Sequence, residues 1–182
     1  MTALLLIDIQ KGIQETGYYG KERNNPQAEE NCTKILNSFR EKELPIYHVQ
    51  HCSTNPDSPL HPSKETHAFY PGVTPKNEEQ VIPKDVNSAF IGTDLEQRLQ
   101  QNGIDKVVIA GLTTEHCIST STRMASNLGF EVTLISDATA AFSKEGIDGK
   151  FIEAEAVHQI ELANLKDEFA TIKDTDTLLS EL

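Results

Sequence analysis

The chain has 182 residues, a size at which one domain around a single hydrophobic core is expected. Hydrophobic residues make up 37% and charged residues 24%, so the chain can bury a core and wholesale disorder is not expected. The 28 acidic and 16 basic side chains leave a net charge of −12, which would repel the phosphates of nucleic acid. We therefore expect no nucleic-acid partner.

Neither a membrane segment nor a secretory segment is predicted. No hydrophobic run approaches the roughly 20 residues that span a bilayer, and residues 1–10 lack the basic region and cleavage site of a signal peptide. The three cysteines, Cys32, Cys52 and Cys117, form no CxxC motif and cannot all pair in disulfides. These features predict a cytoplasmic protein with reduced thiols and no membrane partner.

Hydrophobic patterns along the chain predict alternating strands and helices. Short, nearly continuous hydrophobic runs are typical of parallel strands buried on both faces, and a 3.6-residue period is typical of helices. The predicted strands are residues 3–9, 45–50, 81–84, 106–111, 131–136 and 168–173. The predicted helices are residues 26–42, 93–103, 116–128 and 150–165, with a further short helix in the tail.

Single residues refine these elements. Thr93 and Glu96 have the spacing of a capping box at a helix start. Pro83 favours an edge position for its strand, because proline has no N–H to donate to a neighbour. Residues 51–80 have no sustained period and predict a long loop, a kind of segment that is often functional. The helix at 150–165 is supported by residues in one register, namely Ile152, Ala156, Ile160 and Ala163.

The order of the elements predicts the fold class. Strands that alternate with helices imply right-handed crossovers and a parallel sheet with helices on both faces. We therefore expect an α/β protein with three layers, α/β/α, around a mostly parallel, Rossmann-like sheet. The sequence shows no internal repeat and no second domain boundary, so residues 1–182 are predicted to form one domain.

Three reactive side chains fall where open parallel sheets bind ligands, at the carboxyl ends of strands. Asp8 and Lys84 close two of the predicted strands, and Cys117 lies in a turn from a strand into a helix. A helix start and a nearby lysine lower the pKa of a thiol, and a carboxylate can accept its proton. Acid, amine and thiol would make a nucleophile, although a helix-start cysteine by itself is more often a packing residue.

Several motifs follow one another in a characteristic order. They are Leu4-Leu-Leu-Ile-Asp8-Ile-Gln10, Ile82-Pro-Lys84 with Asn87-Ser-Ala-Phe90, Val108-Ile-Ala-Gly-Leu-Thr-Thr-Glu-His-Cys117-Ile, Gly129-Phe-Glu-Val and Asp137-Ala-Thr-Ala. From about residue 3 to residue 142, the chain resembles the isochorismatase-like cysteine hydrolase superfamily. The resemblance implies an α/β/α sheet, a triad of Asp8, Lys84 and Cys117, and a cis peptide between Leu112 and Thr113. The backbone N–H groups of Thr113 and Cys117 would then form an oxyanion hole.

The resemblance also implies a reaction, a two-step acyl transfer without a cofactor. Asp8 would take the thiol proton, Cys117 would attack a carbonyl carbon, and Lys84 would steady the charges. Many members cleave amide, carbamoyl or ureide bonds, so we expect cleavage of a C–N bond in a small amide- or ureide-like substrate. The resemblance further implies a homo-oligomer, a dimer or a tetramer.

Other functions stay open at this point. Nicotinamidase-type members bind a divalent metal through an Asp-x-His pair, but the stretch Tyr47-His48-Val49-Gln50-His51 lacks that aspartate and favours no metal. Whether His48, His51, His61 or His67 binds a metal is left undecided. Isochorismatase-type members hydrolyse a vinyl ether without metal, and their pattern is closer to this stretch. A non-catalytic binding protein on the same fold, or a redox thiol protein, is a further alternative.

Four residues are predicted to bind substrate, each with a plainer alternative. They are Phe90, which also suits the core; His116, next to the nucleophile, which also suits a helix start; Gln10, which also suits a loop brace; and Tyr19, which with Tyr18 also suits a subunit contact. Arg123 is expected in a surface ion pair rather than on a substrate carboxylate.

Overall fold

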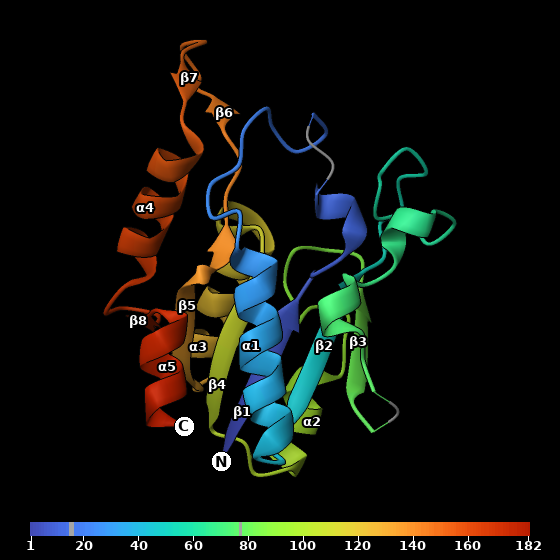
Figure 1. Cartoon of the computed structure of the whole chain (residues 1–182), viewed down its shortest axis with the longest axis vertical. Coiled ribbons are helices and arrows are strands. Elements are labelled where there is room, and N and C mark those ends of the chain that lie inside the picture. The colour runs from blue at the N-terminus through green and yellow to red at the C-terminus, as the bar shows by residue number, and fades with distance from the viewer. Residues whose placement is uncertain (15–16, 77) are drawn as a thin grey trace.

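The computed structural model describes residues 1–14, 17–76 and 78–182. Its centre is one sheet in which every neighbouring pair of strands is parallel (Figure 1). In spatial order the strands are β3 (Gln80–Lys84), β2 (Ile46–His51), β1 (Thr2–Ile7), β4 (Lys106–Leu112), β5 (Glu131–Ala140) and β8 (Thr171–Lys173). The predicted edge position of the strand that contains Pro83 is confirmed, since β3 has one neighbour.

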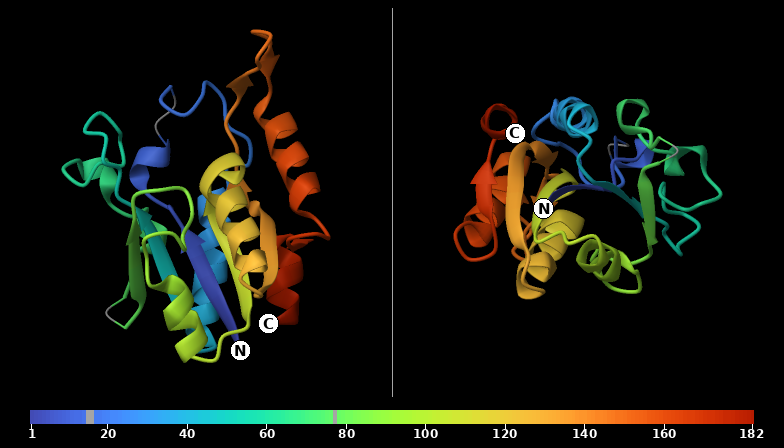
Figure 2. Two further views of the ribbon diagram at one scale, coloured as in Figure 1. Left: turned by 180° about the vertical axis from the view of Figure 1, so that it is seen from behind. Right: turned by 90° about the horizontal axis from the view of Figure 1, so that it is seen from below.

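Helices cover both faces of the sheet. On one face lie α1 (Ala28–Glu41) and α5 (Thr175–Glu181), and on the other α2 (Leu95–Gln101), α3 (Ser119–Asn127) and α4 (Ala154–Leu165) (Figures 1 and 2).

The side chains of β1, a central strand of the sheet, point alternately to its two faces. Leu5 and Ile7 point into the core beneath α2, α3 and α4, whereas Leu4 and Leu6 point into the core beneath α1. All four are almost fully buried, which is why β1 reads as a continuous hydrophobic run. The predicted three-layer α/β/α fold is confirmed.

Several shorter elements connect the strands and helices of the sheet. They are the 3₁₀ turns Lys11–Gln14, Glu65–His67 and Pro71–Val73, the π-helical turn Thr114–Ile118, and the hairpin of β6 (Lys144–Glu145) and β7 (Phe151–Ile152). Figure 1 shows this hairpin projecting beyond the sheet, above α4. The hairpin was not predicted, and it makes α4 start later than the predicted helix at 150–165.

The hydrophobic stripe that supported this helix does not face the core. Ile152 and Ile160 are 36% and 61% exposed, and Ala156 and Ala163 are exposed as well. The buried face of α4 consists of Ala154, His158, Leu162 and Leu165. Periodicity misses this face because a buried polar residue, His158, occupies its centre.

The predicted capping box is wrong. The helix α2 starts at Leu95, and Asp94 at its N-cap makes no side-chain capping bond. The Thr93 hydroxyl instead donates a hydrogen bond of 2.7 Å to the carbonyl of Ala89. The same hydroxyl oxygen accepts from the N–H of Leu95 at 3.4 Å rather than from that of Glu96, so Thr93 forms a local turn in place of the capping box.

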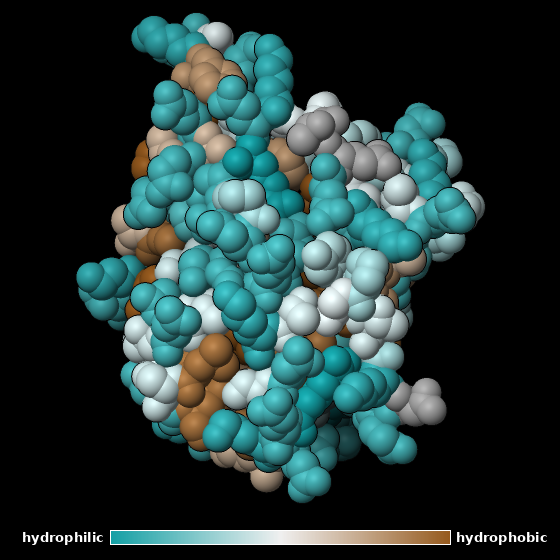
Figure 3. Space-filling view, viewed as in Figure 1, coloured by the Kyte–Doolittle hydropathy of each residue, from teal (hydrophilic) through white to brown (hydrophobic). Residues whose placement is uncertain are grey.

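The face of the molecule that carries α1 and α5 is mostly hydrophilic, with small hydrophobic areas (Figure 3). This agrees with the net charge of −12. In the part of the chain that the structure describes, no helix has the length and hydrophobicity of a bilayer span. The cytoplasmic location stays a prediction.

Candidate active site

The three predicted catalytic side chains converge at the carboxyl ends of β1, β3 and β4. Asp8 directly follows β1, Lys84 is the last residue of β3, and Cys117 lies in the turn after β4. The Lys84 Nζ atom lies 2.7 Å from Asp8 Oδ2 and 3.3 Å from Cys117 Sγ. The Lys84 ammonium also donates to the carbonyl of Val86 at 3.1 Å. Asp8 and Cys117, which are 76 and 33 positions away from Lys84 in the chain, thus share its buried ammonium.

Close approach of β1 and β4 makes this convergence possible. Gly111 pairs with Ile7 across the two strands, and a Cβ at Gly111 would lie 2.0 Å from the Ile7 carbonyl oxygen. Only glycine fits there, and its φ of 141° also favours glycine. Beyond this point Asp8 takes a φ of 55°, and its N–H donates to Val49 at 2.9 Å. The left-handed backbone turns the chain at the residue that carries the carboxylate.

An unusual turn presents Cys117. The peptide bond between Leu112 and Thr113 is cis, at the place that the family resemblance implies. The π-helical turn Thr114–Ile118 follows, in which the N–H of Ile118 donates to the Thr113 carbonyl at 3.2 Å. The α-helix α3 starts only at Ser119, later than the predicted start at 116. The turn leaves Cys117 8% exposed, at the wall of a cavity.

This cavity has a volume of about 330 Å³. Four of its lining residues come from the triad and the predicted substrate-binding set, namely Asp8, Cys117, His116 and Tyr19. The remaining described lining residues are Ile13, Tyr18, His51, Ser53, Ser58, Leu60, Asn87, Leu112 and Thr113. Sequence reasoning missed the single positions Ser53, Ser58 and Leu60, although the signal for them was the predicted functional loop at 51–80.

Two predicted substrate-binding residues are placed elsewhere. Phe90 is 8% exposed and packs on Phe130 in the core, with ring centroids 6.1 Å apart. Gln10 is 1% exposed and holds the segment after β2, since its amide donates to the carbonyls of His51 and His67 and accepts from the His51 N–H. Neither is among the described residues that line the cavity. Their positions match the plainer alternatives, a core residue and a loop brace.

The Cys117 thiol is neutral before substrate binds. Burial raises the pKa of this thiol, the Asp8 carboxylate raises it further, and the Lys84 ammonium lowers it only in part. The sequence-based expectation of a lowered pKa is therefore wrong. The sequence indicated a helix start and a lysine, but it could not show how completely the fold removes the sulfur from water.

The four histidines do not converge on one point. His48 contacts Glu79 at 2.7 Å, His61 contacts Ser63 at 2.8 Å, and His67 lies 3.4 Å from the Cys52 sulfur. His51 alone reaches the candidate site, with its Nδ1 atom 3.0 Å from Lys84 Nζ. Burial and the Lys84 charge both lower the pKa of His51, so the neutral ring accepts a hydrogen bond from the ammonium.

Among the described residues, one group has the spacing of metal ligands: Asp8, His51 and Cys117, whose ligand atoms lie within 4.8 Å of one another. The Lys84 ammonium lies within 3.3 Å of an atom of each. A divalent ion would have to displace this ammonium and would face its positive charge. The residues present do not fit a metal, because Lys84 supplies the cation of the site.

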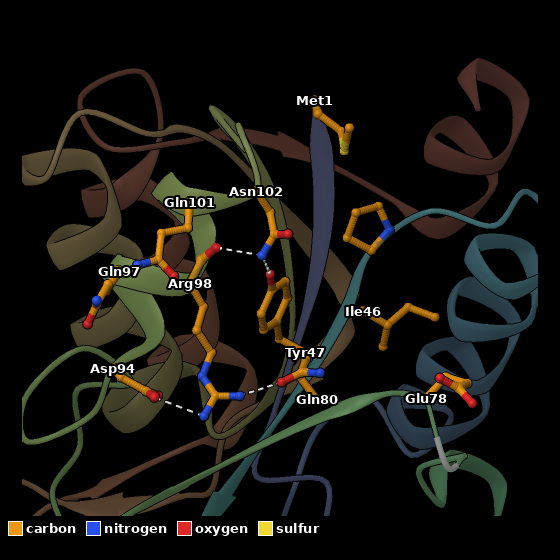
Figure 4. Close-up of a pocket in the computed structure, with 11 residues that line it drawn as sticks. Met1, Ile46, Tyr47, Glu78, Gln80, Asp94, Gln97, Arg98, Gln101 and Asn102 are labelled. Atoms are coloured by element: carbon orange, nitrogen blue, oxygen red, sulfur yellow. Dashed lines mark hydrogen bonds and ion pairs between the residues drawn. The ribbon is translucent and has the colours of Figure 1, made fainter.

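A second cavity, of about 580 Å³, lies at the opposite end of the sheet, where β1, β2 and β3 begin (Figure 4). Arg98 is paired there with Asp94 at 2.8 Å and also donates to Gln80, and Asn102 donates to the Tyr47 hydroxyl at 3.4 Å. None of its described lining residues offers a thiol or a histidine. The chemistry therefore points to the smaller cavity.

The fold and this site define an α/β/α protein with a cysteine, a lysine and an aspartate at the ends of parallel strands. The Isochorismatase domain family matches residues 2–177. The Bacillus subtilis isochorismatase family protein YrdC is 49% identical over 179 residues, which are 98% of this chain and 95% of YrdC. A structure of an isochorismatase family protein from Chromobacterium violaceum has a TM-score of 0.94 and 40% identity, and covers 98% of this chain and 92% of that one.

A further relative, nicotinamidase 3 of Arabidopsis thaliana, is 33% identical over 104 residues, which are 57% of this chain and 47% of the relative. The family match spans almost the whole chain and agrees with the site. The chain therefore belongs to the isochorismatase family of hydrolases, as the sequence resemblance predicted.

Proposed function

We propose that this protein is a metal-independent cysteine hydrolase that cleaves a C–N bond in a small, uncharged amide- or ureide-like substrate. The observation that carries the proposal is the buried contact of one ammonium, Lys84 Nζ, with both Asp8 Oδ2 and Cys117 Sγ. A carboxylate that can accept the thiol proton and a cation that can balance the charge of the thiolate therefore lie beside the same sulfur.

The first half of the reaction acylates Cys117. As the substrate carbonyl binds, Asp8 takes the proton of the Cys117 thiol, and the sulfur forms a bond to the carbonyl carbon. The backbone N–H groups of Thr113 and Cys117 are the proposed donors to the oxyanion. Asp8 then returns its proton to the nitrogen as the C–N bond breaks, which releases ammonia or an amine and leaves a thioester.

The second half hydrolyses the thioester. Asp8 takes a proton from a water molecule as the water oxygen attacks the carbonyl carbon, and the same backbone donors stabilise the second oxyanion. The C–S bond breaks, the proton returns to the Cys117 sulfur, and the carboxylic acid leaves. Lys84 remains positively charged throughout and offsets each negative charge that develops on Asp8 or on the sulfur.

The charge of the cavity favours an uncharged substrate. Among its described lining residues Asp8 is the one ionised side chain, and Lys84 neutralises it. Burial lowers the pKa of His51 and of His116, so neither supplies a positive charge at neutral pH. Lys144 lies 3.4 Å from His116 Nε2 but is paired with Glu115 at 3.0 Å. A substrate carboxylate would therefore be buried without a partner, at a cost of several kcal/mol.

This argument separates the proposal from isochorismate hydrolysis, which is the main alternative. Isochorismate carries two carboxylates, and the described cavity wall offers no free cation for either. Nicotinamide is an uncharged aromatic amide, and its hydrolysis by a relative makes it a natural first test substrate.

The test is a substrate panel with the purified protein, with ammonia release as the readout for amides. The panel contains nicotinamide, benzamide, short aliphatic amides, ureides and isochorismate, each with and without EDTA. We expect turnover of at least one uncharged amide or ureide, unchanged by EDTA and lost in Cys117→Ala. Turnover of isochorismate alone, or full activity of Cys117→Ala, would contradict the proposal.

A further inference from the structure

A buried histidine on α4 contacts the turn that carries the nucleophile. His158 is 2% exposed, and its Nδ1 atom lies 2.8 Å from the hydroxyl of Thr114, which is fully buried. The same hydroxyl lies 3.1 Å from the hydroxyl of Thr139 on β5. Thr114 is the first residue of the π-helical turn Thr114–Ile118 and precedes Cys117 by three positions. The histidine thus binds the base of the turn without contacting the sulfur.

Packing alone does not explain this histidine. The other buried residues of α4, Ala154, Leu162 and Leu165, are hydrophobic, and a leucine at 158 would fill the same face. An imidazole in the core loses the hydrogen bonds of water, a cost that only specific partners offset. The neighbours of the two ring nitrogens are the hydroxyl of Thr114 at Nδ1 and the amide nitrogen of Asn25, which lies 3.4 Å from Nε2.

A neutral ring can satisfy both of its neighbours. Burial lowers the pKa of His158, although Glu155, the Ser136 carbonyl and Glu115 act in the opposite direction. A neutral imidazole has one N–H and one acceptor nitrogen. Asn25 already donates its amide protons to the carbonyls of Ser136 and Thr139, at 3.0 and 2.7 Å. The ring can therefore accept the Thr114 hydroxyl proton at Nδ1 and turn its Nε2–H toward Ser136.

The neighbouring residue of the turn has its own anchor. The Glu115 carboxylate accepts from the N–H of Phe142 at 3.3 Å and from Lys144 at 3.0 Å. The first two residues of the turn are therefore bound to different segments, Thr114 to α4 and Glu115 to the chain after β5. Two such anchors fix the direction in which the turn presents Cys117.

We propose that His158 is a positioning residue that, through Thr114, fixes the turn of Cys117 for attack on the acyl carbon. This inference rests on the proposed hydrolase function, because the attack is the step that needs the fixed geometry. A nucleophile displaced by about 1 Å loses roughly a hundredfold in rate even when the substrate still binds. The role of His158 is therefore expected in kcat rather than in KM.

Paired substitutions at both ends of the hydrogen bond test the proposal. His158→Leu removes the acceptor, whereas His158→Asn keeps a polar atom near the Nδ1 position. Thr114→Val removes the hydroxyl at equal size, whereas Thr114→Ser keeps it. We expect His158→Leu and Thr114→Val to lower kcat by about tenfold or more with little change in KM, and the two polar variants to stay near wild type. The double variant should be no worse than either single loss, because both remove one interaction.

A second readout is independent of turnover. The alkylation rate of Cys117 by iodoacetamide, followed by peptide mass spectrometry, reports how the turn presents the sulfur. We expect it to change in His158→Leu and Thr114→Val but not in Asn164→Ala, a control at an exposed position of the same helix, α4. If the wild type hydrolyses no amide, the proposed function fails, and the alkylation rates still decide the role of His158.

Three results would overturn the positioning role. The first is wild-type kcat and wild-type Cys117 alkylation in both His158→Leu and Thr114→Val. The second is a loss in Thr114→Ser as large as that in Thr114→Val. The third is a loss of activity that matches the loss of folded protein in thermal unfolding. If His158→Leu does not fold, the Thr114 pair gives the answer alone.

Discussion

The Cys117 sulfur lies between two opposite charges, and its reactivity depends on which charge is removed. The Asp8 carboxylate raises the pKa of the thiol, and the Lys84 ammonium lowers it. The two neighbours therefore have different roles in the proposed reaction. Asp8 keeps the resting thiol protonated and accepts the proton once substrate is bound, whereas Lys84 stabilises the thiolate that results.

Asp8→Asn should separate reactivity from catalysis. Without the carboxylate the pKa of Cys117 falls, so alkylation by iodoacetamide at pH 7 should become faster than in the wild type. Turnover should fall by about a thousandfold or more, because no group remains to move the proton between sulfur and nitrogen. Lys84→Met should slow both processes. Slower alkylation in Asp8→Asn, or retained turnover, would contradict these roles.

At the scale of single residues, the sequence predicts which side chains meet better than it predicts their surroundings. Asp8, Lys84 and Cys117 could be grouped because parallel strands end at one edge of the sheet. The raised pKa of Cys117 could not be predicted, because it follows from burial by segments far away in the chain. Phe90 shows the same limit, since an aromatic residue close to Lys84 in sequence packs into the core on Phe130 instead.

Among the elements, β3 depends on an ion pair outside the active site. The Glu79 carboxylate, just before β3, binds Arg40 on α1 at 2.6 Å, His48 on β2 at 2.7 Å and the N–H of Lys76 at 2.9 Å. These bonds, those from Arg40 foremost, lower the pKa of Glu79 to about 2 in spite of its burial. The arrangement fixes the entry to the strand that ends in Lys84.

Glu79 should make stability depend on acid pH. A carboxylate whose pKa is lowered by folding stabilises the protein above its unfolded pKa, and this contribution is lost as the pH falls from about 4.5 toward 2. Glu79→Gln should therefore lower the free energy of unfolding at pH 7 by about 2 kcal/mol, and much less at pH 3. Urea unfolding at both pH values measures the difference.

The exposed neighbour Glu78 supplies the matched control, and Glu78→Gln should have little effect at either pH. An equal loss at pH 7 and pH 3 in Glu79→Gln would show that the carboxylate charge is not the cause.

Elements were predictable where hydrophobic pattern and burial agree, as in β1 and β4. They were less predictable where a polar residue lies in the core. In α4 the buried face includes His158, whereas Ile160 faces solvent, so periodicity marked the opposite side. The hairpin of β6 and β7 was missed because its two-residue strands give too short a pattern to detect.

For the whole molecule, one group of exposed hydrophobic side chains lies on the hairpin and the outward face of α4. Ile147, Phe151 and Ile160 are all more than half exposed, and Figure 3 shows a hydrophobic area over the hairpin. Exposed hydrophobic side chains that cluster on one part of a surface are typical of protein contacts. We expect this region to contribute to the homo-oligomer that the family resemblance implies.

Sedimentation of the wild type should show a dimer or a tetramer, and Ile160→Glu should shift it toward the monomer by burying a charge in the contact. Ile91→Glu is the control, because Ile91 is 51% exposed but lies on a different segment, before α2. A monomeric wild type would contradict the expected homo-oligomer. An assembly that Ile160→Glu leaves unchanged while Ile91→Glu disrupts it would place the subunit contact on another surface.

The central claim is that the Cys117 sulfur, beside Asp8 and Lys84, forms a covalent bond to the acyl group. Mass spectrometry of peptides after a rapid acid quench with p-nitrophenyl acetate, a small uncharged acyl donor, tests it most directly. We predict an acetyl group on the peptide that contains Cys117, formed within the burst of nitrophenol release and absent from Cys117→Ala. A burst without acylation of Cys117, or the acetyl group on Cys52 instead, would contradict the account.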